Sequence, residues 1–298
     1  MLDFSMYKNT AAGVAKIRFT ELQAKNPIVE DKFSSPFVLG SSIIRITGHR
    51  LQYFGFEALV PGLFDGVVAR TKIIDETVLK AVKDGATQYV ILGAGYDTRG
   101  HRLDLPANVK VFEVDQPDIQ AFKVKKVSKL ELPNKENITY VPVDFNTQSL
   151  ETELQKAEGF DPNAKTVVTL EGVSYYIPRE SCQNTISTIS TIVGTGSTFF
   201  LSYADKNCEV NPSAVCSPEN SKGPGSLKRL MRAVKMMGEP WVNFFEQAEL
   251  PAFFKSNGFT LSSDSSLLEL NQKYFAPKGR EIPAKRLMYW ERFAVAVK

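Results

Sequence analysis

Cysteine is scarce in this chain of 298 residues. The three thiols, Cys182, Cys208 and Cys216, are odd in number and show no C-x-x-C spacing. A disulfide framework needs paired cysteines, and structural zinc sites combine closely spaced cysteine and histidine ligands. The sequence therefore argues against both, predicts no metal site and indicates a reducing compartment, which we expect to be the cytoplasm.

Long apolar runs and an excess of one charge are also missing. No run approaches the roughly 20 residues that a membrane helix needs, and residues 1–10 lack the pattern of a signal peptide. The net charge of +3 is small for this length, whereas nucleic-acid-binding domains concentrate basic side chains. We therefore expect neither a membrane nor a nucleic acid as partner. Hydrophobic residues, 43% of the chain, suffice for the core of one large domain.

The most informative positive feature is an apolar strand that runs directly into a glycine turn. Residues 89–92 are a short apolar run, typical of a central strand, and Gly93 and Gly95 follow it. Glycine lets the backbone turn tightly and approach a ligand closely. A dinucleotide site would require a third glycine where Thr98 stands, so the turn favours a cofactor that has a ribose but no pyrophosphate. Taken alone, Gly-x-Gly is equally consistent with a structural turn.

A second strand, residues 110–115, follows the glycine turn after about twenty residues and ends in acid. Its carboxylates stand where the hydroxyls of a cofactor ribose expect an acceptor. Glu113 and Asp115 share one face because alternate residues of a strand point to the same side. Both acids therefore remain candidates for the ribose.

Strands and helices alternate along most of the chain. Helical stripes run from Ala11 to Leu22, with Arg18 on the stripe, and from Phe64 to Val82, with Arg70 beside it. Such alternation predicts an α/β fold with a mostly parallel sheet covered on both faces. Further strands are expected at residues 138–143, 166–170, 197–203, 259–262 and 287–297, and helices near residues 117–130, 148–157 and 179–193.

One stretch breaks this alternation. Residues 205–226 are rich in Asn, Pro, Ser and Gly, which predicts a long loop of the kind that often forms a lid. A helix follows, with Leu227 and Leu230 on its apolar face and Lys228, Arg229 and Arg232 on the others. A solvated basic face is the ordinary explanation, and a lid that meets an acidic substrate is the functional one.

The predicted strand ends carry a consistent set of polar groups. Ligands of open parallel sheets bind at the carboxyl ends of the strands. There Asp144 can accept from an adenine amine with Phe145 against the ring, Glu171 can meet an ammonium, and Arg70 can pair with a carboxylate. S-adenosylmethionine combines adenine, ribose, ammonium and carboxylate. Each acid alone is also explained as a helix cap.

These motifs, taken in order, resemble the leucine carboxyl methyltransferase family, and most closely its bacterial-type branch of S-adenosylmethionine-dependent methyltransferases. The likeness lies in residues 68–75, 90–99, 111–117 and 171–176. It extends to residues 10–31 and 238–241, so it spans most of the chain.

The resemblance implies a class I methyltransferase fold, which is Rossmann-like, with a seven-stranded sheet whose last two strands form an antiparallel hairpin. We expect a single domain with four parts. These are an N-terminal helical cap (1–85), a cofactor-binding core (86–204), a lid insertion (205–250) and the C-terminal hairpin (251–298).

The resemblance also implies the cofactor contacts. It suggests that Arg70 binds the methionine carboxylate and that Asp115, with Glu113 as the alternative, binds the ribose. A basic residue of the N-terminal helix, Arg18 or Lys16, would also reach the cofactor. His101 stands where an aromatic residue is expected and is read as structural, and no role is evident for His49. The expected cofactor-binding residues are Arg70, Gly93, Ala94, Gly95, Asp97, Thr98, Glu113, Asp115, Asp144, Phe145, Glu171 and Arg18.

The sequence therefore predicts an enzyme that moves a methyl group from S-adenosylmethionine to a carboxylate or hydroxyl of a small molecule. A protein carboxyl methyltransferase acting on a terminal leucine is the alternative, and an NAD(P)-dependent oxidoreductase is a more distant one. Tyr175, Tyr176 and Tyr203 near the strand ends are candidates for the substrate pocket, although packed aromatic side chains are more often core. No catalytic residue and no oligomeric state is predicted.

Overall fold

The computed structural model describes residues 10–145 and 147–298. Seven strands form one sheet in the order β3-β2-β1-β4-β5-β7-β6. The first five pair in parallel, and β7 pairs antiparallel with both β5 and β6. The strands are β1 (Gln88–Leu92), β2 (Lys110–Asp115), β3 (Ile138–Pro142), β4 (Thr166–Leu170), β5 (Thr198–Ala204), β6 (Thr260–Ser266) and β7 (Glu291–Val297).

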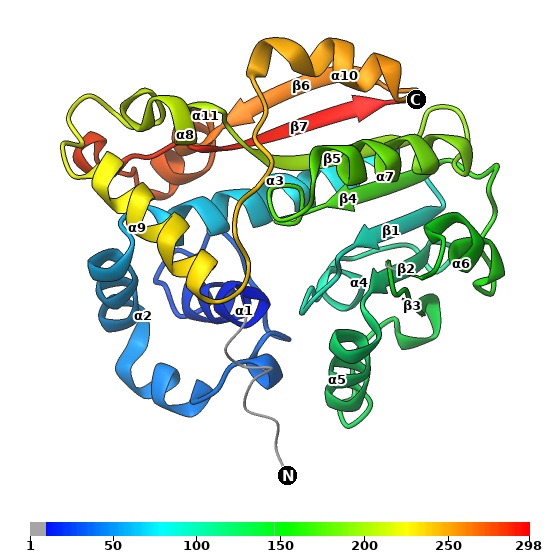
Figure 1. Ribbon diagram of the computed structural model, residues 1–298. Coiled ribbons are helices and arrows are strands. Elements are labelled where there is room, and N and C mark those ends of the chain that lie inside the picture. The colour runs from blue at the N-terminus through cyan, green and yellow to red at the C-terminus, as the bar shows by residue number, and fades with distance from the viewer. Residues whose placement is uncertain (1–9, 146) are drawn as a thin grey trace.

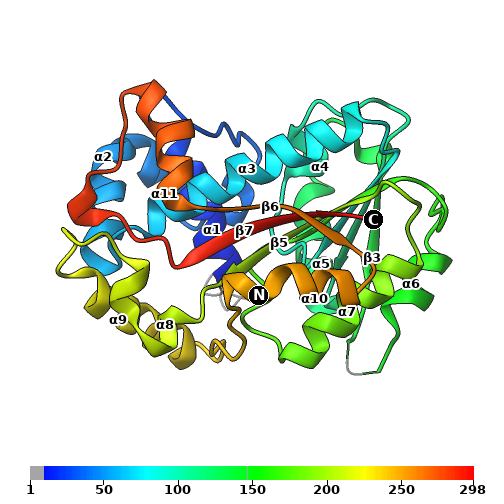
Figure 2. The ribbon, with the colours of Figure 1, turned by 90° about the horizontal axis from the view of Figure 1, so that it is seen from above.

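Helices cover both faces of the sheet, as Figure 2 shows from above, with α3 on one face and α7 and α10 on the other. Helices α1, α2 and α9 gather beyond the end to which the arrows of β1, β4 and β5 point (Figure 1). The α-helices are α1 (Thr10–Glu21), α2 (Ser41–Leu59), α3 (Leu63–Lys83), α4 (Arg99–Arg102), α5 (Pro117–Val127), α6 (Leu150–Lys156), α7 (Arg179–Thr191), α8 (Asn207–Val210), α9 (Gly223–Met236), α10 (Leu250–Ser256) and α11 (Leu267–Leu270).

Two cores lie on the two faces of the sheet because the side chains of each strand alternate. Tyr89 and Ile91 of β1 face the core formed with α3, whereas Val90 and Leu92 face the core formed with α6, α7 and α10. All five residues of β1 and of β4 are buried, as expected for central strands covered on both sides. The predicted α/β class and the hairpin at the end of the sheet are confirmed.

The largest differences from the predicted elements lie outside the central strands. Residues 205–226 are not one loop, since they contain α8 and a 3₁₀ turn, Pro212–Val215. Strand β6 is longer than predicted. Its serines and Asp264 show no apolar alternation from which its full length could be recognised. A bulge between Leu261 and Ser263 also interrupts its register. Helix α2 was not predicted, and non-helical backbone at Gly48 (φ 71°, ψ 175°) divides it.

Among the residues that the structure describes, no helix is both long enough and apolar enough to cross a membrane.

Candidate cofactor and active site

The glycine turn after β1 takes the shape that its sequence predicts. Gly93 and Gly95 both have positive φ, 67° and 45°, where side chains other than glycine are strained. A Cβ on Gly93 would lie 2.5 Å from Cγ2 of Val173. The turn is fastened to β2, since Asp115 Oδ2 accepts from the backbone N–H of Gly95 at 2.5 Å.

The two acids of β2 have different surroundings. Asp115 lies at the end of the strand, half-buried, and Oδ1 accepts from the N–H of Gln116 at 2.7 Å. Glu113 is fully buried, 2.5 Å from Nζ of the equally buried Lys123 of α5. Burial raises the pKa of Glu113 to about 7 and also raises the pKa of Asp115. Of the two acids that the sequence places on one face, Glu113 is therefore paired with a lysine and Asp115 lies at the end of the strand.

Arg70 of α3 stands between two carboxylates. Its Nε donates to Glu171 Oε1 at 2.8 Å, and its Nη1 donates to both oxygens of Glu291, at 2.7 and 3.0 Å. The hydroxyl of Tyr175 lies 3.3 Å from the same Nη1. Burial raises the pKa of Glu291 despite Arg70. Arg70 thus joins the end of β4 to the start of β7, and its partner Glu291 lies 221 residues after Arg70 in the chain.

Arg99 is the second buried hub. It is 1% exposed and its guanidinium contacts Asp97, Asp75 at 2.8 Å and Glu171 at 2.5 Å. Burial opposes ionisation of the acids, but the charge of Arg99 outweighs it and holds the pKa values of Asp97 and Glu171 below their ordinary range. Arg102 adds two bonds of 2.6 Å to Asp75.

The N-terminal helix contributes a third arginine. Arg18 Nε donates to Asp31 at 2.8 Å, and Nη2 donates to the carbonyl of Tyr96 in the glycine turn at 2.6 Å. Thr98 donates to the same Asp31 oxygen at 2.8 Å. Although burial raises the pKa of Asp31, the charges of Arg18 and Arg102 lower it more. Of the two basic residues considered for this helix, Arg18 therefore reaches the turn, while Lys16 lies over the ring of Phe56.

These ion pairs form one buried charge cluster at the carboxyl ends of β1 and β4. Its positive members are four arginines and its negative members are five carboxylates, which leaves one excess negative charge when every acid is ionised. The cluster consists of Arg18, Arg70, Arg99, Arg102, Asp31, Asp75, Asp97, Glu171 and Glu291.

Asp144 and Phe145 follow β3 at the rim of the strand ends. Asp144 Oδ2 accepts from the hydroxyl of Thr147 at 3.0 Å, and its N–H donates to Gln148 at 2.8 Å. The ring of Phe145 is 50% exposed. A large apolar side chain with this exposure beside a polar rim provides a surface on which a planar group can stack.

The three tyrosines named from the sequence lie in two places. Tyr175 contacts Arg70 and Glu291, and its ring packs against Tyr176 and Trp241 with centroids 4.7 and 5.1 Å apart. Tyr203 points to the opposite core, where its hydroxyl donates to Asp264 at 3.0 Å.

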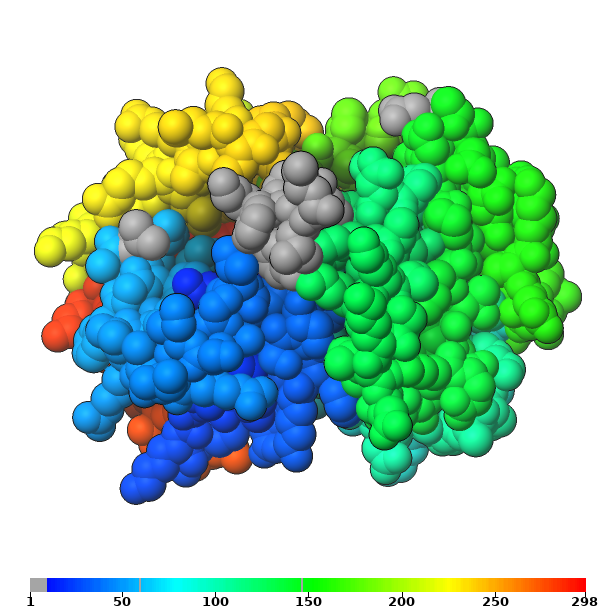
Figure 3. All heavy atoms as spheres, turned by 90° about the horizontal axis from the view of Figure 1, so that it is seen from below, coloured from blue at the N-terminus to red at the C-terminus, as the bar shows by residue number. Residues whose placement is uncertain are grey.

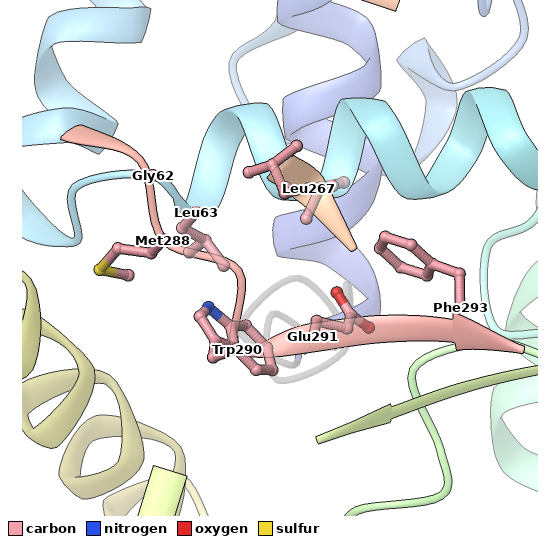
Figure 4. Close-up of a pocket in the computed structure, with 9 residues that line it drawn as sticks. Gly62, Leu63, Leu267, Met288, Trp290, Glu291 and Phe293 are labelled. Atoms are coloured by element: carbon pink, nitrogen blue, oxygen red, sulfur yellow. The ribbon is translucent and has the colours of Figure 1, made fainter. Parts of the chain in front are cut away.

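A small cavity lies behind Glu291, between α3 and β7. In Figure 4 the carboxylate of Glu291 stands among Leu63, Leu267, Trp290 and Phe293. Its volume of about 10 Å³ is close to what one water molecule needs. It is therefore too small for a cofactor or an acceptor.

Several members of the charge cluster could not be found from the sequence. Asp31, Asp75 and Glu291 lie on a loop, a helix and the seventh strand, and only the fold brings them together. Arg99 lies in residues 90–99, which carry part of the family resemblance, but a single arginine after a turn does not indicate three acidic partners. The described residues contain no group of acids, histidines and cysteines arranged to hold a metal ion.

Comparison with known proteins identifies the family. The family model for leucine carboxyl methyltransferase matches residues 11–190. The chain belongs to the leucine carboxyl methyltransferase family. It is therefore an S-adenosylmethionine-dependent methyltransferase, as the resemblance implied.

Similar proteins include named methyltransferases, and a solved structure shares the fold. A Mycobacterium avium protein named "Putative S-adenosyl-L-methionine-dependent methyltransferase" is 28% identical over 279 residues, which cover 85% of this chain and 83% of that protein. YktD of Bacillus subtilis, named in the same way, is 30% identical over 75% of this chain and 70% of its own length. A solved DUF574 family protein from Streptomyces avermitilis shares the fold, with a TM-score of 0.58 at 14% identity over 95% of this chain and 97% of that one.

Proposed function

We propose that this member of the family is an O-methyltransferase that transfers the methyl group to a carboxylate or hydroxyl of a small molecule. The charge cluster supports a cofactor site at the strand ends. S-adenosylmethionine carries a carboxylate, an ammonium and a sulfonium, a net charge of +1, which complements the single excess negative charge of the cluster. Complementary charge of this kind favours binding in a partly buried site.

Arg70 and Glu171 are the proposed partners of the methionine end. A guanidinium binds a carboxylate through paired N–H donors, and the carboxylate of Glu171 suits an ammonium. Glu291 and Arg99 orient these two side chains, at 2.7 and 2.5 Å, and the carboxylate and ammonium of the ligand would replace the direct bond of 2.8 Å between Arg70 and Glu171.

The remaining contacts lie along the turn and the rim. Asp115 is the proposed ribose acceptor because Glu113 is already paired with Lys123. Asp144 and Phe145 are assigned to the adenine, and Gly93 and Gly95 give the backbone close approach. Ala94, Asp97, Thr98 and Arg18 act by shaping and bracing this turn.

The observation that carries the O-methyl proposal is the position of the two histidines. His49 stacks on Tyr53, and Nδ1 of His101 lies 2.9 Å from the carbonyl of Pro133. Among the described residues no hydrogen bond or ion pair joins either ring to Arg70 or Glu171. This arrangement favours a carboxylate over a hydroxyl, because an acceptor that is already an anion needs only alignment and exclusion of water, whereas a hydroxyl must also lose its proton.

The chain's own part in the reaction is therefore positioning. Bound S-adenosylmethionine supplies an electrophilic methyl group on a sulfonium leaving group. Tyr175 and Tyr176, with Trp241, form the proposed aromatic wall on the acceptor side, and burial raises the pKa of Tyr175 far above its ordinary value. Tyr175 therefore remains a neutral phenol that donates a hydrogen bond. Tyr203 is left out of this wall because Asp264 and Arg292 bind its hydroxyl.

The alternative acceptor is a terminal leucine carboxylate of a protein, which the family's description suggests. We favour a small molecule because the chain resembles the bacterial-type branch. The proposal also places the enzyme in the cytoplasm, which the three free cysteines support.

Methyl transfer from radiolabelled cofactor tests the proposal. Aliphatic and aromatic acids, phenols, amines and peptides ending in leucine are offered in parallel, and each product is treated with alkali. A methyl ester releases methanol, whereas an ether does not, so the product's chemistry separates a carboxylate acceptor from a hydroxyl acceptor. Labelling of amines alone would contradict the proposal, and labelling of leucine-ended peptides alone would favour the protein substrate. An Arg70→Ala variant controls for labelling that does not depend on the site.

A further inference from the structure

The outer face of α2 combines bulky apolar side chains with arginines. Ile46 is 86% exposed, and three neighbours are each at least 60% exposed. Residues 41–59 contain one acid, Glu57, and it is buried. The exposed side chains are Ile43, Ile46, Leu51 and Phe54, with Arg45 and Arg50.

Helix α9 presents the same combination. Residues 223–238 contain no acid, the buried face is Leu227, Leu230 and Val234, and the helix ends in Met236, which is 88% exposed, and Met237. Within the described chain none of the cations on α2 or α9 forms an ion pair. The exposed cations of α9 are Lys228, Arg229, Arg232 and Lys235.

Helices α2 and α9 both contribute to the face of the molecule that is seen from below. Seen from below, α9 in yellow and α2 in blue both face the viewer on the same half of the molecule (Figure 3). Val60, just after α2, packs against the hydrophobic cluster to which the buried face of α9 belongs. A groove of about 570 Å³ beside the kink of α2 extends the positive charge, since Lys25, Arg50 and Lys278 line it.

We propose that this outer face of α2 and α9 docks the enzyme on an anionic lipid surface. Amphipathic helices that lie on membranes combine exposed apolar side chains with Lys and Arg. Each cation near an anionic surface contributes attraction, and each apolar side chain contributes burial in the headgroup region. Docking of this kind needs no spanning helix, so the proposal departs from the expectation that no membrane is a partner, which rested on the absence of long apolar runs in the sequence.

Two other occupants fit less well. A second copy bound through the same patch would bring like charges together, because a two-fold interface pairs a surface with itself. A nucleic acid would neutralise the cations but would leave Ile46, Phe54 and Met236 without an apolar partner. The combination of both kinds of side chain favours a lipid surface.

Flotation with vesicles tests the proposal. The full chain is mixed with vesicles of phosphatidylcholine alone or with about 30% phosphatidylglycerol, at low salt and at about 0.5 M NaCl, where surface charges are screened. We expect binding to the anionic vesicles only, and a large loss of binding at high salt. Cofactor and methyl transfer are not needed, so failure here leaves the proposed function standing.

Three double variants locate the surface. Lys228→Gln with Arg232→Gln removes charge, Ile46→Gln with Met236→Gln removes apolar surface, and Leu79→Gln with Lys83→Gln on α3 is the matched control. We expect about a tenfold or greater loss of binding for the first two and no change for the control. Thermal unfolding checks that all three fold.

Each contrary result overturns the proposal. One is no binding to anionic vesicles, and another is equal binding by all three variants. A third is binding of a fluorescent single-stranded oligonucleotide that the charge variant loses and the apolar variant keeps. The last is self-association of the free protein, by light scattering, that the apolar variant abolishes.

Discussion

Charged side chains have opposite surroundings in the interior of the site and on the outer face of α2 and α9. At the strand ends, Arg70 and Arg99 are buried and each contacts at least two carboxylates. On α2 and α9 the cations are exposed and have no acidic partner among the described residues. A buried charge without a partner is costly, so the interior arrangement is explained by folding together with the cofactor. An exposed cation costs little free energy to leave unpaired, so folding does not explain the arrangement of side chains on the outer face. The proposed binding to a lipid surface does explain it.

Removing an interior hub should have the largest effect. Arg99→Ala would leave Asp97 without its ion pair and would leave Asp75 and Glu171 with one arginine partner each, and we expect a loss of about 3–5 kcal/mol in the free energy of unfolding. Urea denaturation measures it. Arg50→Ala on the outer face is the matched control and should change stability by less than about 0.5 kcal/mol. Equal losses in both variants would erase the contrast between the two regions.

The interior also predicts how stability depends on pH. Asp31, Asp97 and Glu171 have folded pKa values below the ordinary carboxyl range, so their contribution is present above about pH 4 and is lost as the pH falls further. Glu113 and Asp65 have folded pKa values raised to about 7, so their contribution is present below about pH 4 and is lost as the pH rises through 7.

The two trends together place the maximum of stability between about pH 4 and 6. Urea denaturation at a series of pH values would show it. A free energy of unfolding that rises steadily up to pH 8 would contradict the environments assigned to Glu113 and Asp65.

The two acids of β2 should differ in what they contribute, one to cofactor binding and the other to the interior. Asp115→Asn should weaken binding of S-adenosylmethionine by about 1.5–3 kcal/mol, the range for hydrogen bonds to charged groups, with little loss of stability. Glu113→Gln should leave the affinity for S-adenosylmethionine unchanged, because Glu113 lies against Lys123 in the interior, and any effect should appear in the free energy of unfolding. Calorimetric titration and urea denaturation of both variants measure the two effects. The reverse pattern would assign the ribose to Glu113.

The smallest effect on folding belongs to the outer face. Lys228→Gln combined with Arg232→Gln should leave the free energy of unfolding within about 0.5 kcal/mol of the parent value, because these side chains have no ion pairs to lose. Urea denaturation at low salt checks this. Stabilisation by more than that amount would mean that repulsion among the cations of this face destabilises the free protein.

The sequence predicted the parts of the fold that rest on local patterns. The run of residues 89–92 and its two glycines specify β1 and the turn, since a buried strand and positive φ both leave local signatures. Strand β6 was predicted, but too short, because a serine-rich edge strand shows no alternation of apolar and polar residues. Helix α2 was missed, since Gly48 interrupts its periodicity and its apolar side chains face outward.

Candidate site residues could be named from the sequence mainly where they stand at the end of a strand. Asp115, Asp144 and Glu171 were named in this way, and their contacts with the cofactor stay predictions. Parity put Glu113 and Asp115 on one face and could not separate them, because the difference comes from Lys123 of a later helix. Glu291 has no local signal at all, since its contact with Arg70 spans 221 residues.

Isothermal calorimetry of the protein and its Arg70→Ala and Asp144→Ala variants is the most direct test of the site. We expect S-adenosylmethionine and S-adenosylhomocysteine, but not NADH, to bind the parent chain with micromolar affinity. Each substitution should then weaken that binding by about 1.5–3 kcal/mol. Unchanged affinity in both variants would show that the cofactor does not lie against Arg70 and Asp144, and the account of the site would be wrong.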